Sequence, residues 1–351
     1  MKKGMTIMTG GVVLITVLLA ALYLYSASRL ARLTQQNTGT HIYDRRYAFV
    51  SMDQSELWQA IYDSAKEQAE LENVYLEWIG QDLVMNYTLE DCMKIAVASK
   101  ADGILLNPDK SGEAEEMIAS AAEAGIPVIT LLDDKGENSR ISYIGVNSYQ
   151  MGELYGKQVL QCLKEEDNHI VVLTDQMTDN NNTNLLYSQM LQTIENGNNR
   201  NHTYDITLYQ INTATSFDAE EDIRDLFIQA DPVPDIMICL DLVSTECAAQ
   251  ALIDYNEVGK VTVIGSYASD TVYEALEKGI LYSTISVDTG EIGQLCVTSM
   301  NEYHNLGNVS NYFNMRLEVI NQKNVAKKRE TEEPEEQPGL QAGRLIFGQA
   351  G

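Results

Sequence analysis

One segment, ADGILLNPDKSGEAEEMIASAAEAGIPVITLLDD, constrains the fold of this chain more than any other. It runs from Ala101 to Asp134 and contains two short apolar runs, at 103–106 and 126–132, that each stop at polar residues. Such runs are typical of buried parallel strands that end at the protein surface. Between them lies a stretch with an acidic first turn and an apolar stripe at helical spacing, which predicts an amphipathic helix. A strand, helix and strand unit of this kind indicates a parallel sheet covered by helices on both faces.

The same order of elements returns in the second half of the chain, with expected strands at 235–240 and 261–265 and an expected helix at 244–255. A chain of 351 residues with 44% apolar content can bury two ordinary cores. The sequence therefore predicts an α/β protein with two doubly wound parallel-sheet lobes. The other expected strands are 47–51, 74–79, 140–145, 170–174, 204–210 and 282–287, and further expected helices are 57–71, 152–163 and 219–228.

The charge of the chain is strongly negative. Lysine and arginine total 24 residues against 51 aspartates and glutamates, which gives a formal net charge of −27. An acidic surface of this kind repels phosphate backbones, so nucleic acid is not expected as a partner. Solubility is the simplest explanation of the acidity.

The residue types that carry catalysis or bind metals form no recognisable pattern in this sequence. The four histidines are dispersed, and the phosphate-binding and nucleophile motifs GxGxxG, GxxxxGK[ST] and GxSxG are absent. We therefore expect no enzyme activity, no metal and no cofactor. The cysteines lie inside expected helices or strands without CxxC spacing and are predicted to be small buried hydrophobic residues; they are Cys92, Cys162, Cys239, Cys247 and Cys296.

The N-terminal residues 1–32 form a predicted membrane or export segment. Lys2 and Lys3 precede an uncharged stretch at 5–25, which as a helix would span about 30 Å of hydrocarbon. Small residues at 26–28 also suit a cleaved signal peptide, but the length of the stretch favours an uncleaved transmembrane anchor. Either alternative places the globular part on the extracytoplasmic face of the cell membrane, or secretes it. Residues 33–45 are the expected tether, and 326–351 are expected to form an acidic, disordered tail.

Four sequence pieces carry a resemblance to a known family: SELWQAIYDSAKEQAE, ADGILLNP with AGIPVITL, ISYIGVNSYQMGELYG, and VTVIG through LYSTISVDTGEIGQL. From Tyr47 to about Ile320 the chain resembles the type 1 periplasmic sugar-binding proteins, the ribose and galactose receptors that share their fold with LacI-type repressors. The resemblance implies a periplasmic-binding-protein-like clamp with a three-segment hinge near Asn147, 287–288 and 315–317. It also implies that lobe 1 comprises 46–146 plus 288–312, and lobe 2 comprises 147–287 plus 313–325.

The candidate ligand site lies where ligands bind in open parallel sheets, outside the carboxyl ends of the strands. Trp58 falls where the family places an aromatic ring that stacks on a sugar, although packing into the lobe is an equally good interpretation. Asn147 lies at the first hinge segment, where its side chain either contacts the ligand or instead fixes the geometry of the hinge. The candidate ligand-binding residues are Asp53, Trp58, Asp133, Asp134, Asn147, Asp241, Tyr267 and Asp288.

Most of the polar residues with which the family binds a sugar are replaced in this sequence. After the fourth strand the family has an Asp-Arg pair that binds hydroxyls bidentately, whereas this chain has Asp133 and Asp134 and no arginine. In the second lobe Leu186 lies near the place of an arginine, and Val287 replaces the hinge glutamine. Two explanations stay open. The pocket holds a different or less polar solute, or the module has lost small-molecule binding and acts through its surface.

The sequence therefore predicts an exported, membrane-tethered solute-binding protein whose lobes close on a monosaccharide or related small molecule. Its expected membrane partner is an ABC-type importer or a sensor histidine kinase. The alternative is a non-catalytic extracellular interaction module with a degenerate cleft. A cleft lined by Trp58, Tyr267 and carboxylates would favour sugar binding, whereas one filled by Leu132, Leu186 and Leu240 would favour an altered or lost ligand. A LacI-type repressor would need a helix-turn-helix where this chain has its membrane segment.

Overall fold

The computed structural model describes residues 41–81, 87–108, 113–134, 139–165, 168–175, 181–198, 202–213, 215–229 and 233–332. The predicted membrane segment, most of the tether and the tail beyond 332 lie outside these residues. Among the described residues, no helix has the length and apolar character needed to cross a membrane. The chain is helical over Val325–Glu332 (α11), where the disordered tail was predicted to begin.

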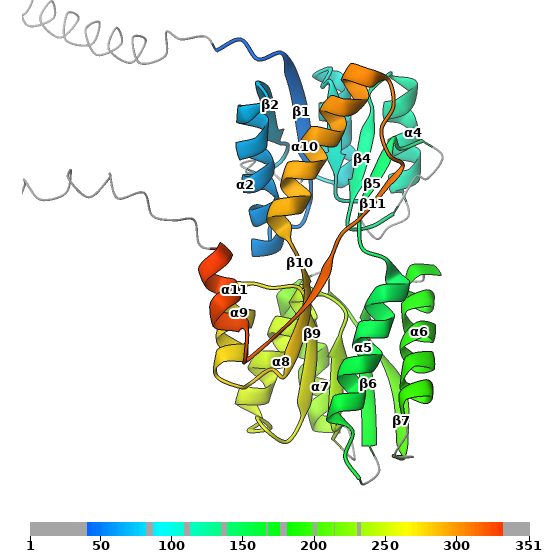
Figure 1. Ribbon diagram of the computed structural model, residues 1–351, viewed down its shortest axis with the longest axis vertical. Helices are drawn as coiled ribbons and strands as arrows, with labels where there is room; N and C mark the ends of the chain where they lie inside the picture. Colours follow the sequence, from blue (N-terminus) through cyan, green and yellow to red (C-terminus); the bar gives the residue numbers. More distant parts are fainter. Residues whose placement is uncertain are drawn as a thin grey trace, which may run out of the picture. The chain divides into compact units, whose positions relative to one another are not determined.

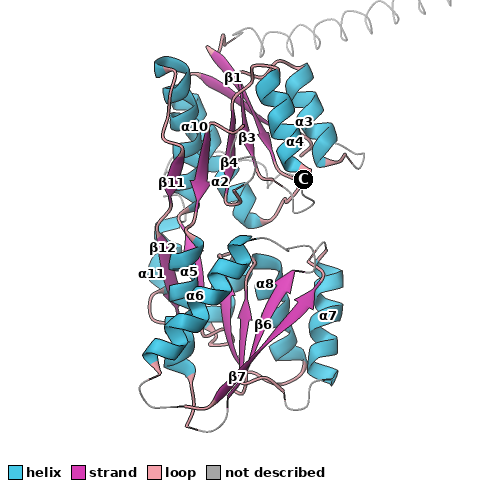
Figure 2. Cartoon of the chain, turned by 90° about the vertical axis from the view of Figure 1, so that its right-hand side faces the viewer, coloured by secondary structure: helices cyan, strands magenta, loops and turns pink. Residues whose placement is uncertain are grey.

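Lobe 1 is built on a six-stranded sheet in the order β11-β5-β4-β3-β1-β2, in which every neighbouring pair is parallel. The segment at 101–134 forms β3, α4 and β4, as predicted. Helices α2 and α10 cover one face of the sheet and α3 and α4 cover the other (Figures 1 and 2). The elements are β1 (Arg45–Val50), α2 (Glu56–Leu71), β2 (Val74–Trp78), α3 (Leu89–Ala98), β3 (Gly103–Leu106), α4 (Ala114–Glu123), β4 (Val128–Leu131), β5 (Ser142–Gly145), α10 (Thr289–Leu306) and β11 (Tyr312–Asn314).

Lobe 2 repeats this plan with a second six-stranded sheet in the order β12-β10-β9-β8-β6-β7. Helices α5 and α6 lie on one face, and α7 and α8 lie on the other (Figure 2). The elements are α5 (Ser148–Cys162), β6 (Asn168–Asp175), α6 (Asn181–Gly197), β7 (Tyr204–Ile211), α7 (Ser216–Gln229), β8 (Ile236–Cys239), α8 (Leu242–Asp254), β9 (Thr262–Ser266), α9 (Asp270–Glu277), β10 (Ser283–Val287) and β12 (Leu317–Asn321), followed by α11.

The chain passes between the two sheets three times, close to the predicted positions. It leaves β5 for α5 at Val146 and Asn147, leaves β10 for α10 at Asp288, and leaves β11 for β12 at Met315 and Arg316. The third passage lies after the predicted boundary at 313, because β11 pairs with β5 through Asn314.

One strand pair departs from the predicted parallel arrangement. β12 is antiparallel to β10, whereas the other pairs of this sheet are parallel. The reason is topological: β10 ends at a passage and β12 begins at one, so the two neighbours run in opposite directions.

The cysteines are all free in the structure. Cys92, Cys239, Cys247 and Cys296 are buried, and Cys162 is half-buried. Burial also raises the pKa of the Cys247 thiol to about 12 and that of Cys162 to about 11. The prediction of small buried hydrophobic residues is therefore confirmed for four of the five cysteines, and a thiol with a raised pKa is also a poor nucleophile.

Each lobe pairs two helices closely through a glycine on the helix that starts at a passage. A Cβ atom on Gly293 of α10 would lie 2.5 Å from the carbonyl oxygen of Ile61 in α2. A Cβ atom on Gly152 of α5 would lie 2.3 Å from the carbonyl oxygen of Leu186 in α6. Both distances are shorter than a van der Waals contact, so only glycine permits these helix pairs.

We expect Gly293→Ala to lower the free energy of unfolding by about 1–3 kcal/mol, the usual cost of overpacking. This loss should appear although alanine favours a helix over glycine by about 1 kcal/mol. Urea unfolding followed by circular dichroism measures the change. The control is Gln294→Ala at the next, exposed position of α10. Equal stability of the two variants would contradict the close contact.

Candidate binding site at the carboxyl ends of the strands

The passages define one edge of each sheet. β5 and β10 end at passages, so the strands parallel to them have their carboxyl ends at the same edges. Seven of the eight predicted site residues follow strand ends there: Asp53 follows β1, Asp133 and Asp134 follow β4, Asn147 follows β5, Asp241 follows β8, Tyr267 follows β9 and Asp288 follows β10. The topology therefore collects the predicted residues at the two edges that the hinge joins.

Three of these residues are helix N-caps. Asn147 begins α5, and its Oδ1 accepts hydrogen bonds from two backbone N–H groups of the first turn, at 2.9 and 3.2 Å. Oδ1 of Asp241 accepts one from the first turn of α8 at 2.8 Å. Oδ1 of Asp288 accepts one from the first turn of α10 at 2.9 Å. A cap satisfies N–H groups that have no partner within the helix, so each side chain already has a structural role.

Asp53 and Asp134 also make contacts within the chain. Oδ1 of Asp53 accepts a hydrogen bond from the backbone N–H of Ser55 at 2.8 Å. Asp134 forms an ion pair with Arg140, whose Nε lies 2.7 Å from Oδ1. The Arg140 side chain is 3% exposed and donates further hydrogen bonds to the backbone and side chain of Asn311. This arginine, which sequence reasoning missed, holds Asp134 to lobe 1.

Trp58 lies in the core of lobe 1. The residue is 4% exposed, and its ring centroid lies 6.2 Å from that of Phe49. Both rings belong to a buried aromatic group with Tyr62 and Trp78. The position therefore matches the packing interpretation, and almost none of its surface is exposed to a solute.

The three leucines that would indicate an altered ligand also pack against the cores. Leu186 is buried in the core of lobe 2, and Leu240 is half-buried against the same core. Leu132 is half-buried and packs against the core cluster that runs through both lobes. All three leucine side chains therefore contact apolar core residues.

The residues directly after β4 and β9 form a matched pair, one in each lobe. Leu132 has a φ of +61° and Tyr267 a φ of +62°. The N–H of Leu132 donates to the carbonyl oxygen of Ile144 at 2.9 Å. The N–H of Tyr267 donates to the carbonyl oxygen of Ile285 at 2.8 Å. Left-handed backbone costs a bulky residue about 1–2 kcal/mol. The hydrogen bonds of these two N–H groups help to hold Leu132 and Tyr267 in that conformation.

The carbonyl groups of the same two residues are also held by hydroxyl groups. The Tyr143 hydroxyl donates to the carbonyl oxygen of Leu132 at 3.2 Å, and the Thr284 hydroxyl donates to that of Tyr267 at 2.6 Å. Tyr143 and Thr284 precede Ile144 and Ile285 on the neighbouring strands. The two lobes therefore fix the strand exits in the same way, a feature that no single motif in the sequence reveals.

The Tyr267 hydroxyl is a protonated donor at neutral pH. Burial raises the pKa of Tyr267 to about 12, and the nearby carboxylates of Asp133 and Asp241 raise it further in the same direction. Asp133 belongs to lobe 1 and Asp241 to lobe 2. Predicted site residues of both lobes thus lie close enough to the Tyr267 phenol for their charges to raise its pKa.

A second meeting of the lobes involves carboxylates that sequence reasoning missed. Oε1 of Glu246 in α8 accepts a hydrogen bond from the Ser269 hydroxyl at 2.6 Å. Burial raises the pKa of Glu246, and the charges of Glu56 and Asp53 in lobe 1 raise it further. Within the part of the chain that the structure describes, no group of three or more His, Cys, Asp or Glu residues is arranged to hold a metal ion.

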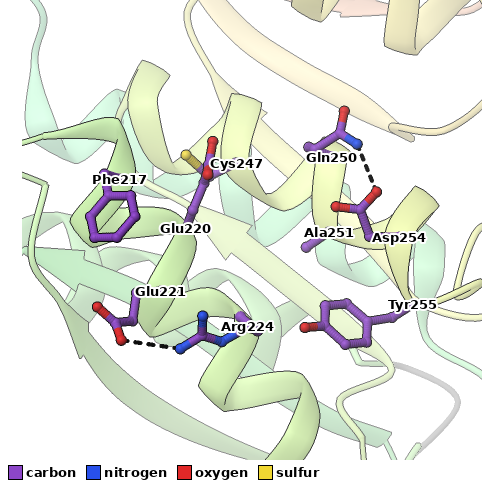
Figure 3. A pocket seen from close by; sticks show the side chains of 9 residues that line it. All are labelled: Phe217, Glu220, Glu221, Arg224, Cys247, Gln250, Ala251, Asp254 and Tyr255. Carbon is purple, nitrogen blue, oxygen red and sulfur yellow. Dashed lines mark hydrogen bonds and ion pairs between the residues drawn. The ribbon is translucent and has the colours of Figure 1, made fainter.

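A hollow of about 160 Å³ lies away from these edges, between α7 and α8 (Figure 3). Arg224 in its wall is paired with Glu221 at 3.1 Å, and Gln250 donates to Asp254 at 2.8 Å. None of the predicted site residues lines this hollow. It is therefore distinct from the candidate site at the strand ends.

We expect Glu246→Gln to stabilise the protein near pH 7, by at most about 1 kcal/mol because solvent screens a half-exposed group. A raised pKa means that the folded protein favours the protonated carboxyl group. Its contribution is therefore present at low pH and is lost as the pH rises through the raised value. Glutamine is neutral throughout and keeps an acceptor for Ser269, so the gain should vanish towards pH 4. Thermal unfolding between pH 4 and 8 measures it.

The control for this experiment is Glu67→Gln on an exposed part of α2, which should show no matching pH dependence. A gain for Glu246→Gln that is the same at pH 4 and pH 8 would contradict the electrostatic account.

Comparison with known proteins places this architecture in a family. Residues 47–307 match the periplasmic binding protein domain. No curated protein matches the sequence. Among solved structures, the glucose-galactose binding protein GanP from Geobacillus stearothermophilus is 20% identical with a TM-score of 0.68, and the alignment covers 80% of this chain and 98% of that one.

Two further structures share the fold. A solute-binding protein of an ABC transporter from Agrobacterium vitis, solved with α-D-tagatopyranose, is 18% identical with a TM-score of 0.72 over 82% of this chain and 97% of its own. A chain of the XylFII-LytSN complex is 22% identical with a TM-score of 0.67 over 80% of this chain and 99% of its own. Because the domain match spans most of the chain, the protein belongs to the periplasmic binding protein domain family, whose members are non-catalytic substrate-binding proteins.

Proposed function

We propose that this protein is a membrane-tethered, extracytoplasmic receptor whose two lobes close on a monosaccharide or a related small molecule. The observation that carries the proposal is the matched pair of strand exits at Leu132 and Tyr267, one on each side of the hinge. Strained backbone of this kind clusters at ligand clamps and switch regions, where the surroundings hold it in place. Hinge closure around a solute is the mechanism that two lobes joined by three passages permit.

Tyr267 is the residue we propose to contact the solute from lobe 2. Its hydroxyl is a protonated hydrogen-bond donor at physiological pH, as in any tyrosine, and the pKa raised to about 12 keeps it protonated in more alkaline solution as well. An aromatic ring also offers an apolar face to a sugar. Leu132 is the corresponding contact from lobe 1, and its apolar side chain favours a solute with fewer hydroxyl groups on that side. Asp133 and Asp241 remain predicted contacts beside the Tyr267 phenol.

A membrane partner completes the proposal. The partner is an ABC-type importer or a sensor kinase that recognises the closed form. Support for a protein partner comes from the related fold of XylFII, which has been solved in a complex with LytSN. The tether to the membrane rests on the sequence of residues 1–32.

The second candidate function is a non-catalytic interaction module that binds no small molecule. Two observations favour it. Trp58, the predicted sugar-stacking residue, is buried in the core. Oδ1 atoms of Asn147, Asp241 and Asp288 already accept hydrogen bonds from helix N-termini.

Thermal unfolding of the full chain in detergent with a panel of monosaccharides separates the two candidates. A solute at a hundredfold excess over its Kd stabilises the folded state by about 2.7 kcal/mol, so the Tm should rise by several degrees. We expect Tyr267→Ala to abolish that rise. Tyr282→Ala, just before the amino end of β10, is the control and should keep it. If no sugar at millimolar concentration shifts the Tm of the unaltered protein, the receptor proposal fails and the interaction module stands.

A further inference from the structure

The first residue of α9 contacts two separate parts of the protein at once. The backbone N–H of Asp270 donates a hydrogen bond to Oε2 of Glu56 at 2.7 Å. Glu56 is the first residue of α2 in lobe 1, whereas α9 belongs to lobe 2. The side-chain Oδ1 of Asp270 lies 3.2 Å from the guanidinium of Arg329 in α11. One residue therefore joins lobe 1 to the last described helix of the chain.

The hydrogen bond from Asp270 to Glu56 of lobe 1 lies at the N-terminus of α9, which is the positive end of the helix dipole. α9 has 8 residues, and its N-cap Ser269 accepts a hydrogen bond from the backbone N–H of Val272 at 3.2 Å. The Glu56 carboxylate satisfies the N–H group of Asp270, the first residue of α9, and places a negative charge at the helix N-terminus, where it is favourable. Because α9 has only about two turns, the hydrogen bonds from its N-terminal N–H groups to Ser269 and Glu56 both help to keep its first turn formed.

Two ion pairs join helix α11 to α9. Arg329 lies 3.2 Å from Asp270 and 3.8 Å from Glu277, which are the first and last residues of α9. Lys328 binds Glu318 of β12 at 3.1 Å, and Val325 is buried. The Asp270 side chain is 71% exposed. Exposed ion pairs are individually weak, so the attachment of α11 responds to small changes in α9.

We infer that Asp270 is a positioning residue that couples the closing of the lobes to the docking of α11. When the lobes separate, Glu56 leaves the N-terminus of α9, the first turn of α9 loosens, and Arg329 loses an ordered partner. When they close, α11 docks. The inference rests on the proposed function only in requiring that the lobes open and close. α11 follows β12 in the chain, and once docked it can present the closed state to a partner.

Hydrogen–deuterium exchange of the full chain in detergent, without any sugar, tests the coupling. We expect Glu56→Ala to speed exchange of the α11 amides on the order of threefold through local opening. The matched control is Glu67→Ala, which removes an exposed charge from the same helix α2 and should leave α11 unchanged. Unchanged α11 exchange in Glu56→Ala would overturn the inference.

A second pair of variants separates coupling from two independent contacts. Asp270→Asn keeps the N–H that binds Glu56 but removes the charge that binds Arg329, so it should speed α11 exchange, and by less than Arg329→Ala, which also removes the ion pair with Glu277. Adding Glu56→Ala to Arg329→Ala should produce little further increase, because the path from lobe 1 to α11 is already broken. Fully additive effects would overturn the inference.

The outcome does not depend on finding a solute. If the sugar panel gives no thermal shift, the receptor proposal fails, yet Glu56→Ala still decides the coupling. If a sugar does bind, it should slow α11 exchange in the unaltered protein and not in Asp270→Asn. A sugar that raises the Tm without slowing α11 exchange in the unaltered protein would contradict the coupling alone.

Discussion

The parallel direction of the strands is the constraint on which this structure depends. Because β5, β10 and β11 all end at passages, the chain can cross between the sheets only at their carboxyl edges. Two of the crossing segments then begin helices, and a helix N-terminus has N–H groups without partners. Asn147 and Asp288 satisfy them. The polar residues at the hinge are therefore required by the architecture itself, before any ligand is considered.

Against that background, Leu132 and Tyr267 are the positions where the architecture alone offers no explanation for the residue. Either could be glycine, which adopts a positive φ without strain. Each lobe instead has a large residue there, and two hydrogen bonds with the neighbouring strand hold the backbone N–H and carbonyl groups of that residue. Placing these side chains at the carboxyl edges requires a strained backbone conformation. For this reason we propose Leu132 and Tyr267, and not the capping carboxylates, as the main ligand contacts.

The parts of the fold that depend on local pattern could be predicted from the sequence. Apolar runs such as 103–106 mark strands because each residue is buried on both faces of a covered sheet. Contacts between residues far apart in the chain could not be predicted. The closeness of Glu246 to Glu56 and Asp53 depends on how two lobes meet, and the antiparallel direction of β12 depends on where a passage lies. Trp58 lies on a helix face, and only packing decides whether such a face meets the core or a ligand.

Hydrophobic periodicity and turn residues act over a few positions, so the two α/β lobes and the ends of their strands followed from the sequence alone, whereas the three passages were implied by the family resemblance. The roles of the side chains at those strand ends became clear only from the folded structure. Asp134 turns to the buried Arg140, Asp241 caps α8, and Tyr267 takes a left-handed backbone beside carboxylates from both lobes. The physical reason is that a polar residue at a strand end has several partners within reach, and the choice among them is made by packing that brings distant segments together.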